Sequence, residues 1–277
     1  LALSIARRSG ASLHLLHVLP EPSSIYTEPP LFVEHDTLGQ RYRQRLREQG
    51  QKYLDDVIRR LETLSGVVAV PVVRDGEVAD VIRDQVVHGG VDLVVMTTHG
   101  RGPLGRMWLG GVADELVRTL PAQVLLVRPM EEEPDLSREP ALHRLVLPLD
   151  GSAPAERIIE PAVELGRLMG ARYTLVRVVS PTDRNDAGLE LLRREAEHYL
   201  EGVAEEMRAR GLDVQTCVLL QEQPAEGILD EARRGGGDLI ALETHGRRGL
   251  PRLFLGSVAD KLVRGGSVPI LVHCRNQ

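Results

Sequence analysis

Short runs of aliphatic and β-branched residues alternate along the chain with longer segments of helical periodicity, and this alternation predicts an α/β fold. A helical segment separates each apolar run from the next, so the strands are expected to lie parallel in a sheet covered by helices. In the second half the predicted strands are 144–149, 172–179, 212–219, 238–243 and 268–273, and the predicted helices are 153–169, 186–210, 225–234 and 257–265.

The first half follows the same order but begins inside a helix. Its predicted helices are 1–9, 38–65, 77–88 and 111–120, and its predicted strands are 12–19, 67–73, 92–97 and 123–128. Apolar residues recur at steps of three, four and seven in helix 38–65 and predict one buried stripe, made of Tyr42, Leu46, Tyr53, Val57, Leu61 and Leu64.

An internal repeat explains why the two halves look alike. Thr-His-Gly-Arg occurs at 98–101 and again at 244–247, and 14 of the 21 residues from 98 to 118 are identical to those 146 positions later. Further upstream the offset is 160, since Gly10 matches Gly170, so the first copy holds 14 additional residues. We place them in the proline-rich stretch 20–37, as a surface loop.

The chain of 277 residues is long enough for two such domains. We predict domain 1 at 1–128, an acidic, proline-containing linker at 129–142, and domain 2 at 143–277. Because strand 1 of the first copy would precede residue 1, the natural chain is expected to begin about twenty residues earlier with a strand like 144–150.

The composition of the chain disfavours some classes of binding partner and indicates a cellular compartment. A net charge of −6 disfavours nucleic acid and anionic lipid, and no apolar run approaches the ~20 residues that span a membrane. Cys217 and Cys274 are too few for a disulfide framework and have no metal-ligand spacing. We therefore expect a cytoplasmic protein.

The second half carries the sequence LVLPLDGS at 145–152, then DLI at 238–240, THGR at 244–247 and LGSVAD at 255–260. These segments resemble the universal stress protein A-like domain, and the similarity covers nearly the whole chain, twice. The resemblance implies two tandem open parallel five-stranded sheets of order 3-2-1-4-5, a Rossmann-like type that binds adenine nucleotides. The ligand crevice would lie at the carboxyl ends of strands 1 and 4.

The resemblance also implies an ATP loop of the form Gly-x2-Gly-x9-Gly-(Ser/Thr) after strand 4, where glycines and helix amides approach the phosphates. In the second copy Gly246, Gly256 and Ser257 fit it, but Glu243 stands at the first glycine. A carboxylate facing the phosphates is expected to repel them by ~1 to 4 kcal/mol. In the first copy the four positions are Thr97, Gly100, Gly110 and Gly111, so this copy is the weaker site.

The adenosine end of the ligand is implied to contact Pro148, Asp150, Val178 and Val258, with Asp150 accepting a hydrogen bond from the ribose. Asp150 also fits a helix cap in Asp-Gly-Ser, and the two roles are compatible. ATP is the expected ligand, and whether Mg²⁺ accompanies it stays open. The repeated histidines, His99 and His245, are interpreted as structural residues. The loop arginines are candidate phosphate partners, but solvent exposure is the favoured interpretation: Arg101, Arg106, Arg247 and Arg252.

Three functions remain open, and all concern the loop after strand 4. The first is a non-catalytic stress-response module that binds ATP through the second copy. The second is an interaction protein whose two loops have lost nucleotide binding. The third is slow ATP hydrolysis, for which only Asp150 and Glu243 offer a base or metal ligand, so we do not expect an enzyme.

The last strand of each copy is an apolar sheet edge, which invites pairing. From the resemblance to dimers of single-domain relatives, strands 123–128 and 268–273 are expected to pair antiparallel and to relate the two copies by a pseudo-twofold axis. Further assembly into a homo-oligomer stays open.

Overall fold

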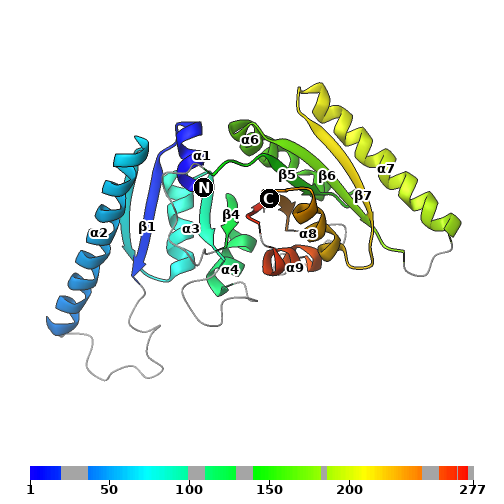
Figure 1. The fold of residues 1–277 in the computed structure, drawn as a ribbon. Helices are drawn as coiled ribbons and strands as arrows, with labels where there is room; N and C mark the ends of the chain where they lie inside the picture. Colours follow the sequence, from blue (N-terminus) through cyan, green and yellow to red (C-terminus); the bar gives the residue numbers. More distant parts are fainter. Residues whose placement is uncertain are drawn as a thin grey trace, which may run out of the picture. The chain divides into compact units, whose positions relative to one another are not determined.

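The structure, a computed structural model, describes residues 1–19, 37–98, 110–128, 140–181, 186–244, 256–266 and 268–273 (Figure 1). The chain divides into two compact units, one within Leu1–Gly90 and Asp135–Pro140, the other within Val91–Pro134 and Ala141–Gln277. The proposed loop at 20–37 falls almost wholly outside the described residues. Most of both Thr-His-Gly-Arg loops does so as well.

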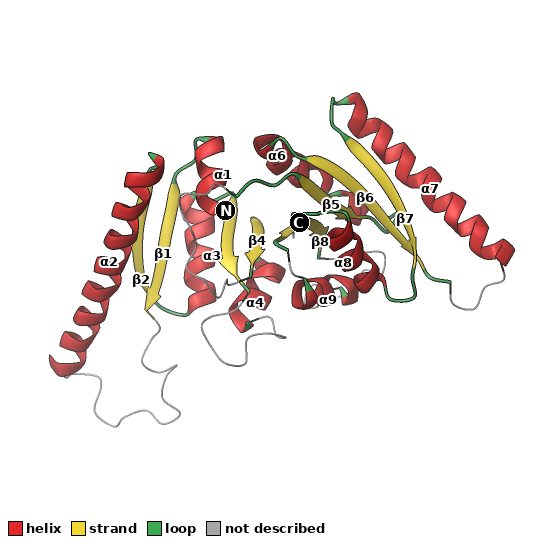
Figure 2. Ribbon diagram, viewed as in Figure 1, coloured by secondary structure: helices red, strands yellow, loops and turns green. Residues whose placement is uncertain are grey.

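The first unit contains a two-stranded parallel sheet with three helices. Its elements are α1 (Ala2–Ser9), β1 (Leu13–Leu19), α2 (Thr37–Ser65), β2 (Ala69–Asp75) and α3 (Val78–Gly89). β1 and β2 pair from Leu13↔Ala69 to Leu19↔Asp75. Helix α2 packs along both strands, and α1 and α3 contact β1 (Figure 2).

The buried stripe of α2 differs from the predicted one. Tyr42 and Tyr53 are 63% and 60% exposed, whereas Leu54, Ile58 and Leu61 are buried. The prediction was therefore wrong at the two tyrosines. The long helix of the second copy buries Leu200, Ala204 and Met207, which are the repeat equivalents of those three residues. Two overlapping stripes fit the periodicity of this helix, and only packing on the strands selects between them.

The second unit is built on one seven-stranded sheet. Its strands are β3 (Leu93–Thr97), β4 (Gln123–Val127), β5 (Arg144–Pro148), β6 (Arg172–Val179), β7 (Val214–Leu220), β8 (Leu239–Glu243) and β9 (Ile270–His273), and its helices are α4 (Gly111–Thr119), α5 (Ala153–Glu156), α6 (Ile159–Met169), α7 (Asp186–Ala209), α8 (Pro224–Arg234) and α9 (Ser257–Gly265). The sheet order is β3-β4-β9-β8-β5-β6-β7. Within the second copy this is the order 3-2-1-4-5, as predicted from the resemblance.

Strands β4 and β9 join the two copies in this sheet. They pair antiparallel through Val124↔Val272, Leu125↔Leu271 and Leu126↔Ile270, and all six side chains are buried. This is the pairing expected for the two apolar edges, and it removes both edges from solvent. The pseudo-twofold relation between the whole copies stays a prediction.

The four described strands of the first copy form two separate parallel pairs, β1 with β2 and β3 with β4. In the second copy β5 lies between β6 and β8 and joins the two corresponding pairs. The described residues of the first copy include no counterpart of β5. Only the second copy therefore forms a continuous five-stranded sheet in the part of the chain that the structure describes.

The predicted helix 153–169 is interrupted after Glu156, where α5 ends, and α6 begins at Ile159. Pro161 accounts for the break, because a proline in a helix interior lacks the donor for the carbonyl four residues earlier and its ring clashes with that carbonyl. With α6 beginning at Ile159, Pro161 lies in a first turn, where the missing N–H costs nothing. The interruption creates the four-residue helix α5 next to the end of β5.

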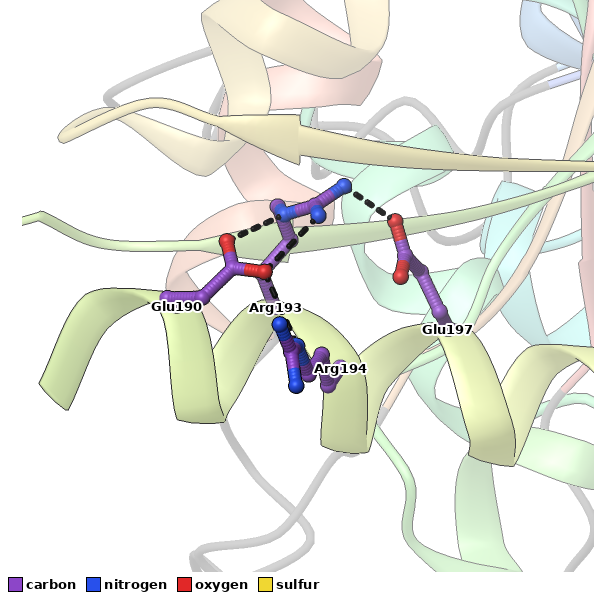
Figure 3. A network of polar contacts seen from close by, with 4 residues as sticks. All are labelled: Glu190, Arg193, Arg194 and Glu197. Atoms are coloured by element: carbon purple, nitrogen blue, oxygen red, sulfur yellow. Dashed lines mark hydrogen bonds and ion pairs between the residues drawn. The ribbon is translucent and has the colours of Figure 1, made fainter. Parts of the chain in front are cut away.

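Helix α7 lies along β6 and β7, and α8 packs beside α9 (Figure 2). Helix α7 carries a network of ion pairs in which Glu190 is held by Arg193 and Arg194, while Arg193 also reaches Glu197 (Figure 3). None of the helices in the described segments combines the length and the apolar character needed to cross a membrane.

Candidate functional site

The sheet order reverses at β5, which pairs with β6 on one side and with β8 on the other. The carboxyl ends of these parallel strands therefore share one edge of the sheet, which is where doubly wound folds bind ligands. Pro148 ends β5, and its partner on β6 is Val176. The half-buried Val178 lies two residues further along β6, at the same edge. The predicted residues Pro148, Asp150 and Val178 are thus brought to one edge.

Asp150 organises the turn that follows β5. Its Oδ1 accepts hydrogen bonds from the amide of Ser152 at 3.0 Å and from the hydroxyl of Ser152 at 2.6 Å. Ser152 is the N-cap of α5, and its Oγ accepts from the amide of Ala155 at 3.4 Å. Gly151 adopts a φ of 83°, a conformation that side chains disfavour. The capping role predicted for Asp150 is present, with Ser152 as the cap itself.

The glycines that precede α9 in the second copy and α4 in the first copy make equivalent contacts. Gly256 precedes α9, and its amide donates to the carbonyl of Thr244 at 2.9 Å. Gly110 precedes α4, and its amide donates to the carbonyl of Thr98 at 3.0 Å. A Cβ added at Gly256 or Gly110 would lie 3.1 or 3.3 Å from that oxygen. Both glycines therefore close the base of a loop, whatever the loop binds.

The predicted phosphate contacts lie only in part within the described residues. Ser257 and Val258 begin α9, Ser257 exposed and Val258 half-buried. Amides in a first helical turn lack intrahelical partners and form the positive end of the helix dipole. Asp260, also in that first turn, is paired with Arg264 at 2.8 Å. Gly246, Gly100, both repeated histidines and all four loop arginines lie outside the described residues.

The Glu243 carboxylate has a partner on the neighbouring strand that the sequence did not reveal. Its Oε1 lies 2.5 Å from Nδ1 of His273, the neighbour of Glu243 on β9. The two side chains are only 7% and 19% exposed. A carboxylate can only accept, so His273 donates from Nδ1. The Glu243 side chain is thus covered and paired, and the repulsion of phosphates by its carboxylate stays a prediction.

His273 was not identified from the sequence. Its repeat equivalent is Val127, which neighbours Thr97 on β4, so the first copy has an uncharged pair at the same place. The available signal in the sequence was a pair of differences between the copies: the second copy has His273 where the first has Val127, and Glu243 where the first has Thr97. The two changes lie thirty positions apart, and the sheet register is needed to connect them.

A second polar cluster borders the turn of Asp150. The Tyr199 hydroxyl, on α7, donates to Oε1 of Glu156 on α5 at 2.7 Å. The guanidinium of Arg177, on β6, lies 4.9 Å from the centre of the Tyr199 ring. Burial, followed by the hydrogen bond to Glu156, raises the pKa of Tyr199 above its ordinary value. Tyr199 is thus a neutral hydrogen-bond donor throughout the ordinary pH range.

In the segments that the structure describes, no group of three or more His, Cys, Asp or Glu side chains is arranged to hold a metal ion.

A family model described as the universal stress protein family matches the chain twice, at residues 1–128 and 141–273. The chain belongs to the universal stress protein family. Its two copies of the family domain make it a tandem member.

Relatives agree with this assignment. A universal stress protein of Mycolicibacterium smegmatis is 25% identical over 236 residues, which cover 81% of this chain and 74% of that protein. One from Thermus aquaticus is 33% identical over 131 residues, or 46% of this chain and 96% of that protein. The crystal structure of a universal stress protein from Archaeoglobus fulgidus has a TM-score of 0.71 at 18% identity and covers 99% of this chain and 92% of its own, which supports the fold.

Proposed function

We propose that this universal stress protein binds ATP, without catalysis, at the carboxyl ends of β5 and β8 in its second copy. The observation that carries the proposal is that Asp150 follows β5 and Gly256 follows β8, while these strands are neighbours at the point where the sheet order reverses. A nucleotide at this edge would have a carboxylate at one end and a helix start at the other. These are the groups that suit a ribose and a phosphate chain.

Each candidate residue has a proposed part in holding the nucleotide. Pro148, Val178 and Val258 would surround the adenine, and Asp150 would accept a hydrogen bond from the ribose. Gly246, Gly256 and Ser257 would contact the phosphates. Mg²⁺ would be held by the phosphates, with water completing its shell.

The pairing of Glu243 with His273 supports the second copy as the binding copy. A free carboxylate at 243 would oppose phosphates, whereas this carboxylate is hydrogen-bonded to His273 on the neighbouring strand at 2.5 Å and its side chain is 7% exposed. In the first copy, Gly110 has the same loop-closing contact, yet the described residues include no equivalent of Asp150. We therefore propose one strong site in each chain, with Gly100 and Gly110 belonging to a weaker one.

The proposal includes the organisation of the chain. Domains 1–128 and 143–277 would be related by a pseudo-twofold axis, with the linker at 129–142 between them, and the antiparallel pairing of β4 with β9 supports this relation. A cytoplasmic location is proposed as well. The free thiol of Cys217 is compatible with a reducing compartment.

Titration calorimetry of the 277-residue chain with ATP tests the proposal, with Asp150→Asn as the informative variant. Asparagine retains an oxygen that can accept from Ser152, so the turn is kept while the carboxylate is lost. Loss of a hydrogen bond to a charged group is expected to weaken ATP binding by about tenfold or more. An Asp150→Asn variant that binds ATP as tightly as the wild type would refute the proposed ribose contact.

The alternative function, an interaction protein without a nucleotide, is separated from the proposal by the same titration. Absence of a binding signal in the wild type would favour the alternative. Steady release of phosphate from bound ATP would instead indicate slow hydrolysis.

A further inference from the structure

Helix α5, the segment next to Asp150, is too short to be stable by itself. It has four residues, Ala153–Glu156, whereas isolated helices become stable only at about 12–15 residues. Contacts with the rest of the domain must therefore hold it in place: Ala155 is buried, α5 packs against β8, and both ends of the helix are hydrogen-bonded. At its start, Asp150 and Ser152 supply the cap. At its end, Glu156 accepts the hydrogen bond from Tyr199.

The hydroxyl of Tyr199 comes from a rigid neighbour. Tyr199 lies in the middle of the 24-residue helix α7, next to Leu200, which is fully buried. Arg177 on β6 lies against the ring. The negative charge of Asp150 adds to the effects that raise the pKa of Tyr199, after burial and the bond to Glu156.

Comparison of the two copies shows which contacts of Tyr199 are also present in the first copy and which are specific to the second. Tyr53 is the equivalent of Tyr199 at the offset of 146, and His17 is the equivalent of Arg177 at the offset of 160. His17 and Tyr53 also contact each other, with ring centres 6.2 Å apart. A basic side chain against the tyrosine is thus common to both copies.

The hydroxyl contact is different in the two copies. Tyr53 is 60% exposed, and the described part of the first copy has no equivalent of Glu156. Among the residues that the structure describes, only the second copy joins its long helix to the turn after strand 1.

We propose that Tyr199 is a positioning residue, which holds α5 through Glu156 and so fixes the Asp150 carboxylate in the orientation that recognises a ribose. This inference rests on the proposed function for its ligand. Its structural half, the fixing of the turn at Asp150–Glu156, is independent of any ligand. The two halves therefore have separate tests.

Hydrogen exchange on the nucleotide-free chain tests the structural half, with Tyr199→Phe and the matched variant Tyr53→Phe. The amides of Ser152 and Ala155 report on the turn, because each donates to a side chain within it. Tyr199→Phe is expected to speed their exchange about fivefold or more, and Tyr53→Phe to leave it unchanged. Unchanged exchange at both amides in Tyr199→Phe would overturn the inference, whether or not the chain binds ATP.

Discrimination between ATP and 2′-deoxy-ATP or 3′-deoxy-ATP tests the functional half. If Asp150 is held for the ribose, the wild type prefers ATP to at least one deoxy analogue, and Tyr199→Phe reduces that preference severalfold. A general loss of stability would weaken the binding of all three nucleotides equally and leave the ratio of their affinities unchanged. An unchanged ratio in Tyr199→Phe would contradict a positioning role.

Glu156→Gln should behave nearly as the wild type, because its amide oxygen still accepts from Tyr199, whereas Glu156→Ala should behave as Tyr199→Phe. Equal effects of the two substitutions at Glu156 would argue against the hydrogen bond as the cause. A wild type that binds none of the three nucleotides would refute the proposed function alone, and the exchange experiment would still decide the role of Tyr199.

Discussion

Glu243 Oε1 and His273 Nδ1 lie 2.5 Å apart, at the carboxyl ends of two neighbouring strands. The pair occupies the place where the family's nucleotide loop would begin, and the first copy has Thr97 beside Val127 there. A buried carboxylate requires a partner, since its desolvation is otherwise uncompensated. The pair thus explains how a charged residue is accommodated at this position.

Removal of the histidine is expected to destabilise the protein. In His273→Ala the Glu243 carboxylate loses its donor, which should lower the free energy of unfolding by about 1–3 kcal/mol. Glu243→Gln in the same chain removes the buried charge and should recover part of that loss. Denaturant unfolding of the two single variants and the double variant measures the coupling. Additive effects of the two substitutions would show that the residues do not interact.

Removal of the Glu243 side chain should have little effect on nucleotide binding. Because the carboxylate is 7% exposed and paired with His273, Glu243→Gly is expected to change the Kd for ATP by less than about threefold. Calorimetry on the wild type and the variant checks this. A large gain in affinity would mean that the carboxylate obstructs the ligand.

Two glycines of the second copy should respond in opposite ways to alanine. A Cβ at Gly166 would clash with Oη of Tyr173, a side chain that is 1% exposed and donates to the carbonyl of Val163. Gly166→Ala should therefore cost about 1–3 kcal/mol of stability. Gly202, on the exposed side of α7, has no atom within 4 Å of its added Cβ, and Gly202→Ala should gain up to about 1 kcal/mol. Thermal unfolding compares the two variants, and a stabilised Gly166→Ala would contradict the close packing of Gly166 against Tyr173.

The network on α7 should make stability depend on acid pH. Hydrogen bonds from Arg193 and Arg194 lower the pKa of Glu190 from an ordinary 4.5 to about 2. The ionised form is thus favoured in the folded state, and its stabilisation is fully present above pH 4.5 and is lost as the pH falls towards 2. Unfolding followed across this range should show a smaller pH dependence in Glu190→Gln, and the difference should shrink with added salt. An identical pH dependence would show that the network does not stabilise the fold.

Much of the fold follows from local patterns. The bounds of β6 and α9 were predicted to the residue, because each is a distinct run of apolar or helical periodicity. The break before α6 was missed, although Pro161 signals it. The tyrosines of α2 were misplaced because side-chain burial depends on what the helix packs against.

The sequence predicted those residues of the candidate site that belong to local motifs, but not the contacts between residues far apart in the sequence. Asp150 and Gly256 were identified from motifs, whereas His273 and Tyr199 act through partners that only the folded sheet brings near.

The central claim is that the second copy binds the nucleotide, and the pair Gly256→Ala and Gly110→Ala tests it most directly. Each substitution places a methyl group against the carbonyl of the equivalent threonine, 3.1 Å from Thr244 in Gly256→Ala and 3.3 Å from Thr98 in Gly110→Ala, so both should cost a similar amount of stability, about 1 kcal/mol. Titration calorimetry with ATP should give one site per chain in the wild type, an affinity reduced about tenfold in Gly256→Ala, and an unchanged affinity in Gly110→Ala. Unchanged binding in Gly256→Ala together with a loss in Gly110→Ala would contradict the assignment to the second copy.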